Sequence, residues 1–178
     1  MNPTKYNSPQ VALHWLTAAV IMFLLVTGTL VLSNMENTDP EKVNNIRIHM
    51  LLGGSAFVLI LGRIAWRAKA EQPAHLQTGN VLLDKLGVAA HYVLNLTALL
   101  IAVSGVSLAI FSGLIDVAFF GQGSLPKDFF DYVPRYVHGI STKVMIGLIV
   151  LHIAGAAYHA LIIKDSPFRR IWFGKSHQ

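Results

Sequence analysis

The sequence predicts an all-α fold, an integral membrane four-helix bundle that occupies residues 1–178 as a single domain. Hydrophobic residues make up 53% of the 178 positions and charged residues only 13%, which is too apolar for a soluble domain of this size. Four stretches with few or no charges are each long enough to cross a bilayer. These spans and their connections use nearly the whole chain, which leaves no room for a second domain. The protein is therefore expected to lie in a lipid bilayer.

The first expected span, residues 11–32, contains no Asp, Glu, Lys or Arg, and a polar run follows it. The second span, residues 46–66, has a shorter uncharged centre between Arg47 and Arg63. Long arginine side chains can reach back to polar surroundings, so this stretch can still cross the membrane.

The third expected span covers residues 86–113 and the fourth covers residues 136–163, which begins after Pro134. The N-terminal segment, the connection between the second and third spans counted from Arg63, and the C-terminal tail together hold nine basic and three acidic residues. The other two connections hold four basic and six acidic residues. Because basic residues concentrate on the cytoplasmic side, both termini are expected to face the cytoplasm. The net charge of +5 is then a topology signal and does not indicate nucleic-acid binding.

Cysteine is absent from the chain. This excludes disulfides, iron–sulfur clusters, thiolate ligands and the covalent attachment of a c-type haem.

Histidines stand out within the apolar spans, where polar groups are costly unless they are satisfied. A lone histidine would be explained by a hydrogen bond between helices, but six together indicate a function. The six are His14, His49, His91, His138, His152 and His159.

The spacing of these histidines predicts two sites at different depths. His138 and His152 are 14 positions apart, close to four helical turns, so they share one helix face about 21 Å apart. His49 opens the second span at the level of His138, and His14 opens the first span at the level of His152. Haem iron accepts an imidazole on each face, and the pairs therefore predict two b-type haems, bound by His49/His138 and His14/His152.

Three arginines are candidates for pairing with haem propionates. Arg63 follows His49 by 14 positions, and Arg47 and Arg135 precede the ligands at the other level. Snorkelling or topology signalling is the alternative explanation for each. Gly28, 14 positions after His14, is one of the small residues that could make room for a porphyrin, although close helix packing explains glycines equally well.

His91, Asn95 and His159 are candidate quinone-binding residues beside the His14/His152 level. A quinone needs hydrogen-bond and proton partners for its carbonyl oxygens, and neutral imidazoles provide both. A structural hydrogen bond is the rival explanation. His75, in a connection, and His177, in the tail, are most simply exposed to solvent.

Together these segments resemble the bacterial cytochrome b561 family over nearly the whole chain, especially its short stand-alone members that include superoxide oxidase. The residues that carry the resemblance are His14-Trp15, Arg47-Ile48-His49, His91, His138, His152, Tyr158-His159, Lys164-Asp165 and Arg169-Arg170. In those relatives the fourth helix supplies one ligand to each haem, and the first and second helices supply the others. The resemblance also implies location in the bacterial inner membrane, with His91 and His159 beside a quinone.

The expected function is one-electron transfer from a periplasmic donor to the His49/His138 haem, then to the His14/His152 haem, and finally to ubiquinone. The resemblance implies superoxide as that donor, so that the protein would be a superoxide:ubiquinone oxidoreductase. An alternative within this class is a cytochrome b mediator or subunit that serves a periplasmic dehydrogenase or hydrogenase. A histidine-lined proton or metal transporter is an alternative of another class, and it predicts a colourless protein. A structural anchor without a redox centre is a third, and it leaves the paired levels of the histidines unexplained.

Overall fold

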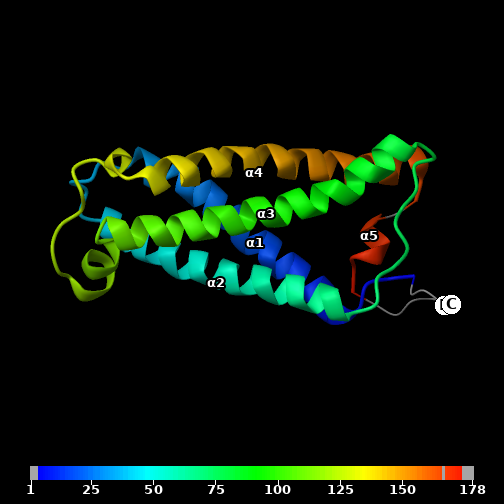
Figure 1. Ribbon diagram of the computed structural model, residues 1–178, viewed down its shortest axis with the longest axis horizontal. Coiled ribbons are helices and arrows are strands. Elements are labelled where there is room, and N and C mark those ends of the chain that lie inside the picture. Colours follow the sequence, from blue (N-terminus) through cyan, green and yellow to red (C-terminus); the bar gives the residue numbers. More distant parts are fainter. Residues whose placement is uncertain (1–3, 166, 174–178) are drawn as a thin grey trace.

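Four long helices form an up-and-down bundle in the computed structural model, which describes residues 4–165 and 167–173. They are α1 (Ser8–Leu30), α2 (Lys42–Lys69), α3 (Val81–Phe111) and α4 (Val133–Tyr158) (Figure 1). Four helical segments are long and apolar enough to cross a membrane. The predicted all-α, four-helix membrane architecture is therefore confirmed.

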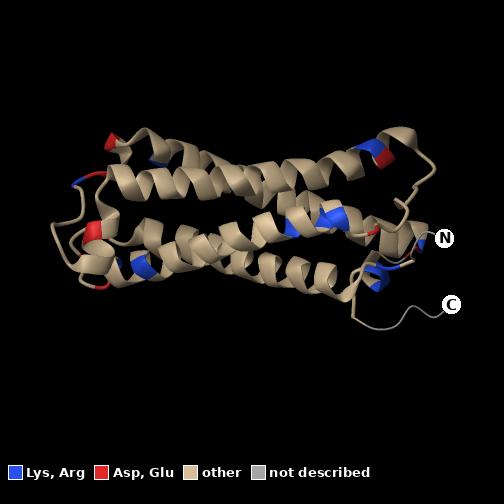
Figure 2. Ribbon diagram, turned by 60° about the horizontal axis from the view of Figure 1, so that its bottom comes forward, with Lys and Arg blue, Asp and Glu red and all other residues tan. Residues whose placement is uncertain are grey.

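Short helical turns close the bundle at both ends. At one end, called the loop end here, lie η1 (Leu32–Asn34), η2 (Asp116–Phe120) and η3 (Phe129–Asp131). At the other, called the terminal end, lie residues 4–7, the connection 70–80, η4 (His159–Ile163) and α5 (Pro167–Arg170) (Figure 1). Charged residues gather toward these two ends, as Figure 2 shows.

The first and last described segments are joined at the terminal end. The Tyr6 backbone N–H donates to the Arg170 carbonyl at 3.1 Å, and the Arg170 guanidinium donates to the Ala74 carbonyl at 2.5 Å. Trp15 adds a third tie, because its indole N–H donates to the Ile171 carbonyl at 2.8 Å. The chain beyond α4 is thus held against the start of α1 and the connection 70–80.

Each long helix begins three to five residues before the start predicted from the apolar stretches. Hydropathy marks the lipid-contacting segment, whereas polar caps extend the helix beyond it. Asn7 and Gln10 form a reciprocal capping box at the start of α1, with bonds of 3.0 and 3.1 Å. The Asn80 side chain accepts from the Leu82 N–H at the start of α3, and Pro134 lies in the first turn of α4.

The ends of the helices differ from the predicted boundaries as well. α2 continues three residues further than predicted, to Lys69, whereas α1 gives way to η1. Gly113, with φ +70°, follows the end of α3, and α4 changes to the π-helical turn η4 at His159. Gly113 takes the left-handed conformation that a non-glycine residue adopts only at a cost.

An apolar layer fills the middle of the bundle with one buried residue from each long helix, Leu25, Ile60, Ala98 and Met145. Met145 lies seven positions from both His138 and His152. Many large apolar side chains face outward, as expected where lipid is the solvent. The buried layer therefore separates the two ends of the bundle and the histidines near each end.

Candidate functional site

His49 of α2 and His138 of α4 face each other at the loop end, as the sequence predicted from their levels. Their ring centroids are 6.3 Å apart, and the ring planes are 73° apart. The His138 Nδ1 lies 3.0 Å from the Ile101 carbonyl and 3.3 Å from the Ser104 hydroxyl. Because a carbonyl can only accept, Nδ1 carries the proton and Nε2 keeps its lone pair for another partner. Ile101 and Ser104 had no signal in the sequence.

Two glycines let neighbouring helices approach these imidazoles. A Cβ added at Gly28 of α1 would lie 3.2 Å from Cε1 of His49. One added at Gly105 of α3 would lie 3.1 Å from Cε1 and 3.3 Å from Nδ1 of His138. The two distances to Cε1 atoms are shorter than an ordinary contact between carbon atoms. The sequence pointed to Gly28 but missed Gly105, which has no feature that separates it from an ordinary packing glycine.

Arg47 and Arg135 both lie at this end. The Arg47 Nε–H donates to the carbonyl of Ala118 in η2 at 2.5 Å. The Arg135 guanidinium lies 4.9 Å from the centroid of the Phe130 ring and is an electrostatic neighbour of His138. Each guanidinium retains further N–H groups that these contacts do not use.

Lys42 is a third cation here, and sequence reasoning counted it only as a loop charge. The residue is 7% exposed, its ammonium donates to the Met35 carbonyl, and it lies 5.9 Å from the Phe129 ring centroid. It is also an electrostatic neighbour of Arg135. The loop end therefore gathers positive charge near the His49/His138 pair, although its connections are net acidic.

Three imidazoles meet toward the terminal end, from His14 of α1, His91 of α3 and His152 of α4. The rings of His91 and His152 are 5.2 Å apart and nearly perpendicular, at 87°. His14 is an electrostatic neighbour of both. The His91 Nδ1–H donates to the Gly87 carbonyl of its own helix at 2.9 Å. The structure thus brings the predicted pair together with a third histidine.

Arg63 of α2 lies at this same level, as its 14-position distance from His49 predicted. Its guanidinium is an electrostatic neighbour of His14, His91 and His152. The side chain is half-buried. Arg63 is therefore placed where it can pair with an anionic group bound among these three imidazoles.

Several of these imidazoles have hydrogen-bonding capacity that the protein does not use. The Nδ1 atoms of His14 and His49 are buried without a hydrogen-bond partner in the described part of the chain. Among the described residues, no hydrogen bond involves Nε2 of His14, His49, His138 or His152. Polar atoms left unpaired in this way cost free energy unless a bound group satisfies them.

His159 and Asn95 lie less centrally. The His159 Nδ1 is 2.9 Å from Oδ1 of Asp165, and its ring is 6.3 Å from that of Tyr158. Asn95 is half-buried one turn along α3 from His91 and makes no hydrogen bond within the described residues. The structure therefore shows no contact that joins all three candidate quinone residues.

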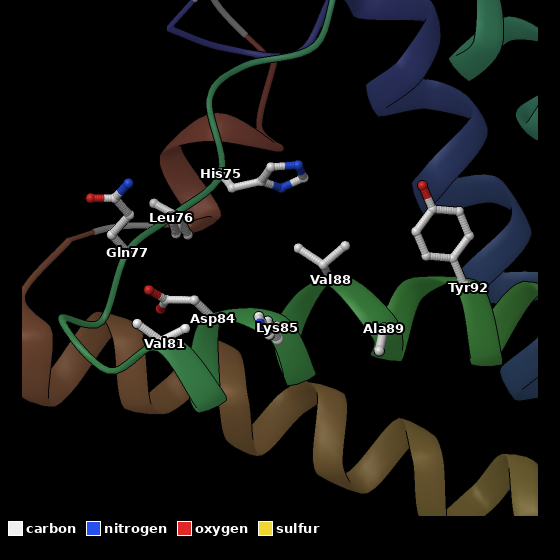
Figure 3. A pocket seen from close by; sticks show the side chains of 9 residues that line it. All are labelled: His75, Leu76, Gln77, Val81, Asp84, Lys85, Val88, Ala89 and Tyr92. Atoms are coloured by element: carbon white, nitrogen blue, oxygen red, sulfur yellow. The ribbon is translucent and has the colours of Figure 1, made fainter.

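A groove of about 510 Å³ lies beside this region, between the connection at residues 75–77 and the start of α3 (Figure 3). His75 and Tyr92 line it together with apolar residues such as Val88. His75 is exposed, as predicted, and is an electrostatic neighbour of His91. His177 lies outside the described residues.

The family model described as prokaryotic cytochrome b561 matches residues 5–174 of the chain. A comparison with curated proteins found no match. The family match covers nearly the whole chain, including all four long helices and the six histidines of the apolar spans. The chain therefore belongs to the prokaryotic cytochrome b561 family and is a multi-pass membrane protein that transfers electrons by means of b-type haem.

Proposed function

We propose that the protein passes electrons one at a time from superoxide in the periplasm, through two b-type haems, to ubiquinone at the cytoplasmic side of the inner membrane. The terminal end, with both termini, faces the cytoplasm in this proposal. The observation that carries it is the presence of two sets of half-buried imidazoles, one toward each end of the bundle, with α4 contributing to both.

His49 and His138 would hold one haem between their two imidazoles. A metal–imidazole bond of about 2 Å on each side, plus roughly 1 Å from each nitrogen to its ring centre, separates two ring centroids by about 6 Å. The rings of His49 and His138 are 6.3 Å apart, and both Nε2 atoms are without a hydrogen bond among the described residues. Arg47 and Arg135 are the propionate partners proposed for this haem.

His14 and His152 are the proposed ligands of the second haem, with Arg63 as its propionate partner. His91 lies closer to His152 than an axial pair allows, since 5.2 Å between the ring centroids leaves too little room for a metal ion between them. His91 is therefore a neighbour of the site and is free to contact a substrate. This supports its assignment, with Asn95 and His159, to the quinone.

The haem group would supply the one-electron redox chemistry. The residues of the chain would orient its ligands, exclude water and adjust its reduction potential. The bond from His138 Nδ1–H to the Ile101 carbonyl orients the ring and makes Nε2 a better donor to a metal. The layer of Leu25, Ile60 and Met145 excludes water between the two levels. The positive charge of Arg63 favours the reduced state at the level of His14 and His152, since reduction adds negative charge.

Superoxide is proposed as donor because Arg135 is an electrostatic neighbour of His138, Lys42 is a neighbour of Arg135, and Arg47 lies at the same end of the bundle, and this positive charge attracts an anion. Two superoxide ions release two dioxygen molecules and two electrons. One ubiquinone takes up those two electrons and two protons and becomes ubiquinol. The equation balances without any further oxidant or reductant.

The test uses purified protein with its haem bound. Its absorption spectrum, before and after dithionite, is expected to show two bis-histidine haems b per chain. A superoxide source should then reduce the haems, and a soluble ubiquinone analogue should reoxidise them with two superoxide ions consumed per quinol. The His49→Ala variant is the control, because it should lose the first electron acceptor.

Other outcomes would point to the alternatives. Haem that superoxide does not reduce, but that a reduced periplasmic protein does, would replace this proposal with a mediator or a dehydrogenase or hydrogenase subunit. A measured content of one haem per chain would contradict the proposed electron transfer through two haems.

A further inference from the structure

The end of α4 brings a carboxylate back onto His159. α4 changes there to the π-helical turn η4, and Lys164 follows with φ +63°. The left-handed conformation is unfavourable for a lysine, and residues held in it often mark functional sites. The resulting reversal places Oδ1 of Asp165 at 2.9 Å from Nδ1 of His159, six positions earlier.

The two side chains differ in their access to water. His159 is 18% exposed and Asp165 is 31% exposed, so the carboxylate is the more accessible partner. The carboxylate accepts from the Nδ1–H, which leaves Nε2 on the opposite side of the ring as the atom that can exchange a proton. Other charged groups at this end include Lys5 before α1, Arg63, Arg67 and Lys69 on α2, Glu71 after it, Asp84 and Lys85 on α3, Lys164 after η4, and Arg169 and Arg170 on α5, which packs against η4.

We propose that His159 protonates the reduced quinone and that Asp165 is the positioning residue that holds His159 for this step. The inference rests on the proposed function. The step starts with a proton on both ring nitrogens of His159. As ubiquinone becomes ubiquinol, the Nε2–H bond breaks, an O–H bond forms at one quinone oxygen, and the ring is left neutral. The second oxygen takes its proton from water. The Nδ1–H stays bonded to Asp165, and Nε2 regains a proton from cytoplasmic water after the quinol leaves.

The experiment compares three variants in the protein with its haems bound. Asp165→Asn removes the charge but keeps an oxygen that can accept a hydrogen bond, and Asp165→Glu restores the charge. Asp84→Asn is the matched control, since Asp84 is an electrostatic neighbour of His159 without a hydrogen bond to it. Each protein is reduced with limiting dithionite and mixed with a ubiquinone analogue from about pH 6 to about pH 9, while haem absorbance reports reoxidation.

Asp165→Asn should slow reoxidation by roughly tenfold or more near neutral pH, because a neutral amide no longer supports the protonated imidazole. The rate should recover as the pH falls. Asp165→Glu should restore much of the wild-type rate, and Asp84→Asn should stay within about twofold of wild type. Haem content and reduction by dithionite should be unchanged in all three, which separates this effect from misfolding.

Three results would overturn the inference. If Asp165→Asn matches wild type at every pH, Asp165 has no role in the step, while the proposed function stands. If Asp84→Asn slows reoxidation as much as Asp165→Asn, the general electrostatic field and not the hydrogen bond is responsible. If quinone does not reoxidise the wild-type protein, the proposed function fails and the inference fails with it.

Discussion

Gly105→Ala should weaken the binding of the haem proposed at the loop end without replacing either proposed ligand. The new Cβ would lie 3.1 Å from Cε1 of His138 and 3.3 Å from its Nδ1. Carbon atoms in comfortable contact are about 3.5–4.0 Å apart, so the ring or α3 must move by several tenths of an ångström. That movement also disturbs the 3.0 Å bond to the Ile101 carbonyl, which orients the ring. Overpacking of this kind costs about 1–3 kcal/mol, equivalent to a roughly 5- to 150-fold weaker haem affinity.

The measurement is the rate at which each haem passes from the protein to an excess of apomyoglobin, followed by absorbance. Gly147→Ala is the matched control, because a Cβ at Gly147 meets nothing within 4 Å. The Gly105→Ala protein should lose one haem faster by the stated factor and retain the other at the control rate. Equal rates of loss in the two variants, with both haems kept, would refute the placement of a haem against His138.

Three further outcomes are expected. His49→Ala and His152→Ala should each remove a different haem, as redox titration of the remaining one would show; depletion of the same haem by both would contradict the pairing. Arg63→Gln should lower the potential of the terminal-end haem by an amount equivalent to roughly 1 kcal/mol, since a nearby positive charge favours reduction, and an unchanged potential would remove Arg63 from that site. A cysteine introduced at Gln77, in a chain that has none, should react with a membrane-impermeant maleimide only from the cytoplasmic side, and labelling from the periplasm would reverse the topology.

The features that follow from simple periodicity could be predicted from the sequence. A bilayer requires long uncharged helices, and four such stretches predicted the four helices of the bundle. The 14-position interval from His138 to His152 fixed two levels on one helix, because 14 residues make nearly four whole turns. His49 then faces His138 as its place in the second span implied.

The features that depend on the path of the connections could not be predicted. Lys42 is buried because Met35 and Phe129 fold over it, and nothing in the sequence distinguishes it from other loop lysines. The contact between Asp165 and His159 requires a left-handed Lys164, a conformation that lysine seldom adopts. The close meeting of His91 and His152 depends on the rotation of α3 against α4, which hydropathy does not determine.

The two proposed ligand pairs have a consequence for how the protein assembles. α1 packs on α2 and α3 packs on α4, so the bundle is a pair of helical hairpins joined by the connection 70–80. His14 and His49 belong to the first hairpin, whereas His138 and His152 belong to the second. Each haem would therefore join the two hairpins, because each proposed pair takes one histidine from each hairpin. The hairpins can enter the membrane separately, and haem binding would then stabilise their association. Cells starved of haem should therefore accumulate a chain whose halves come apart readily and whose linking segment is open to proteases.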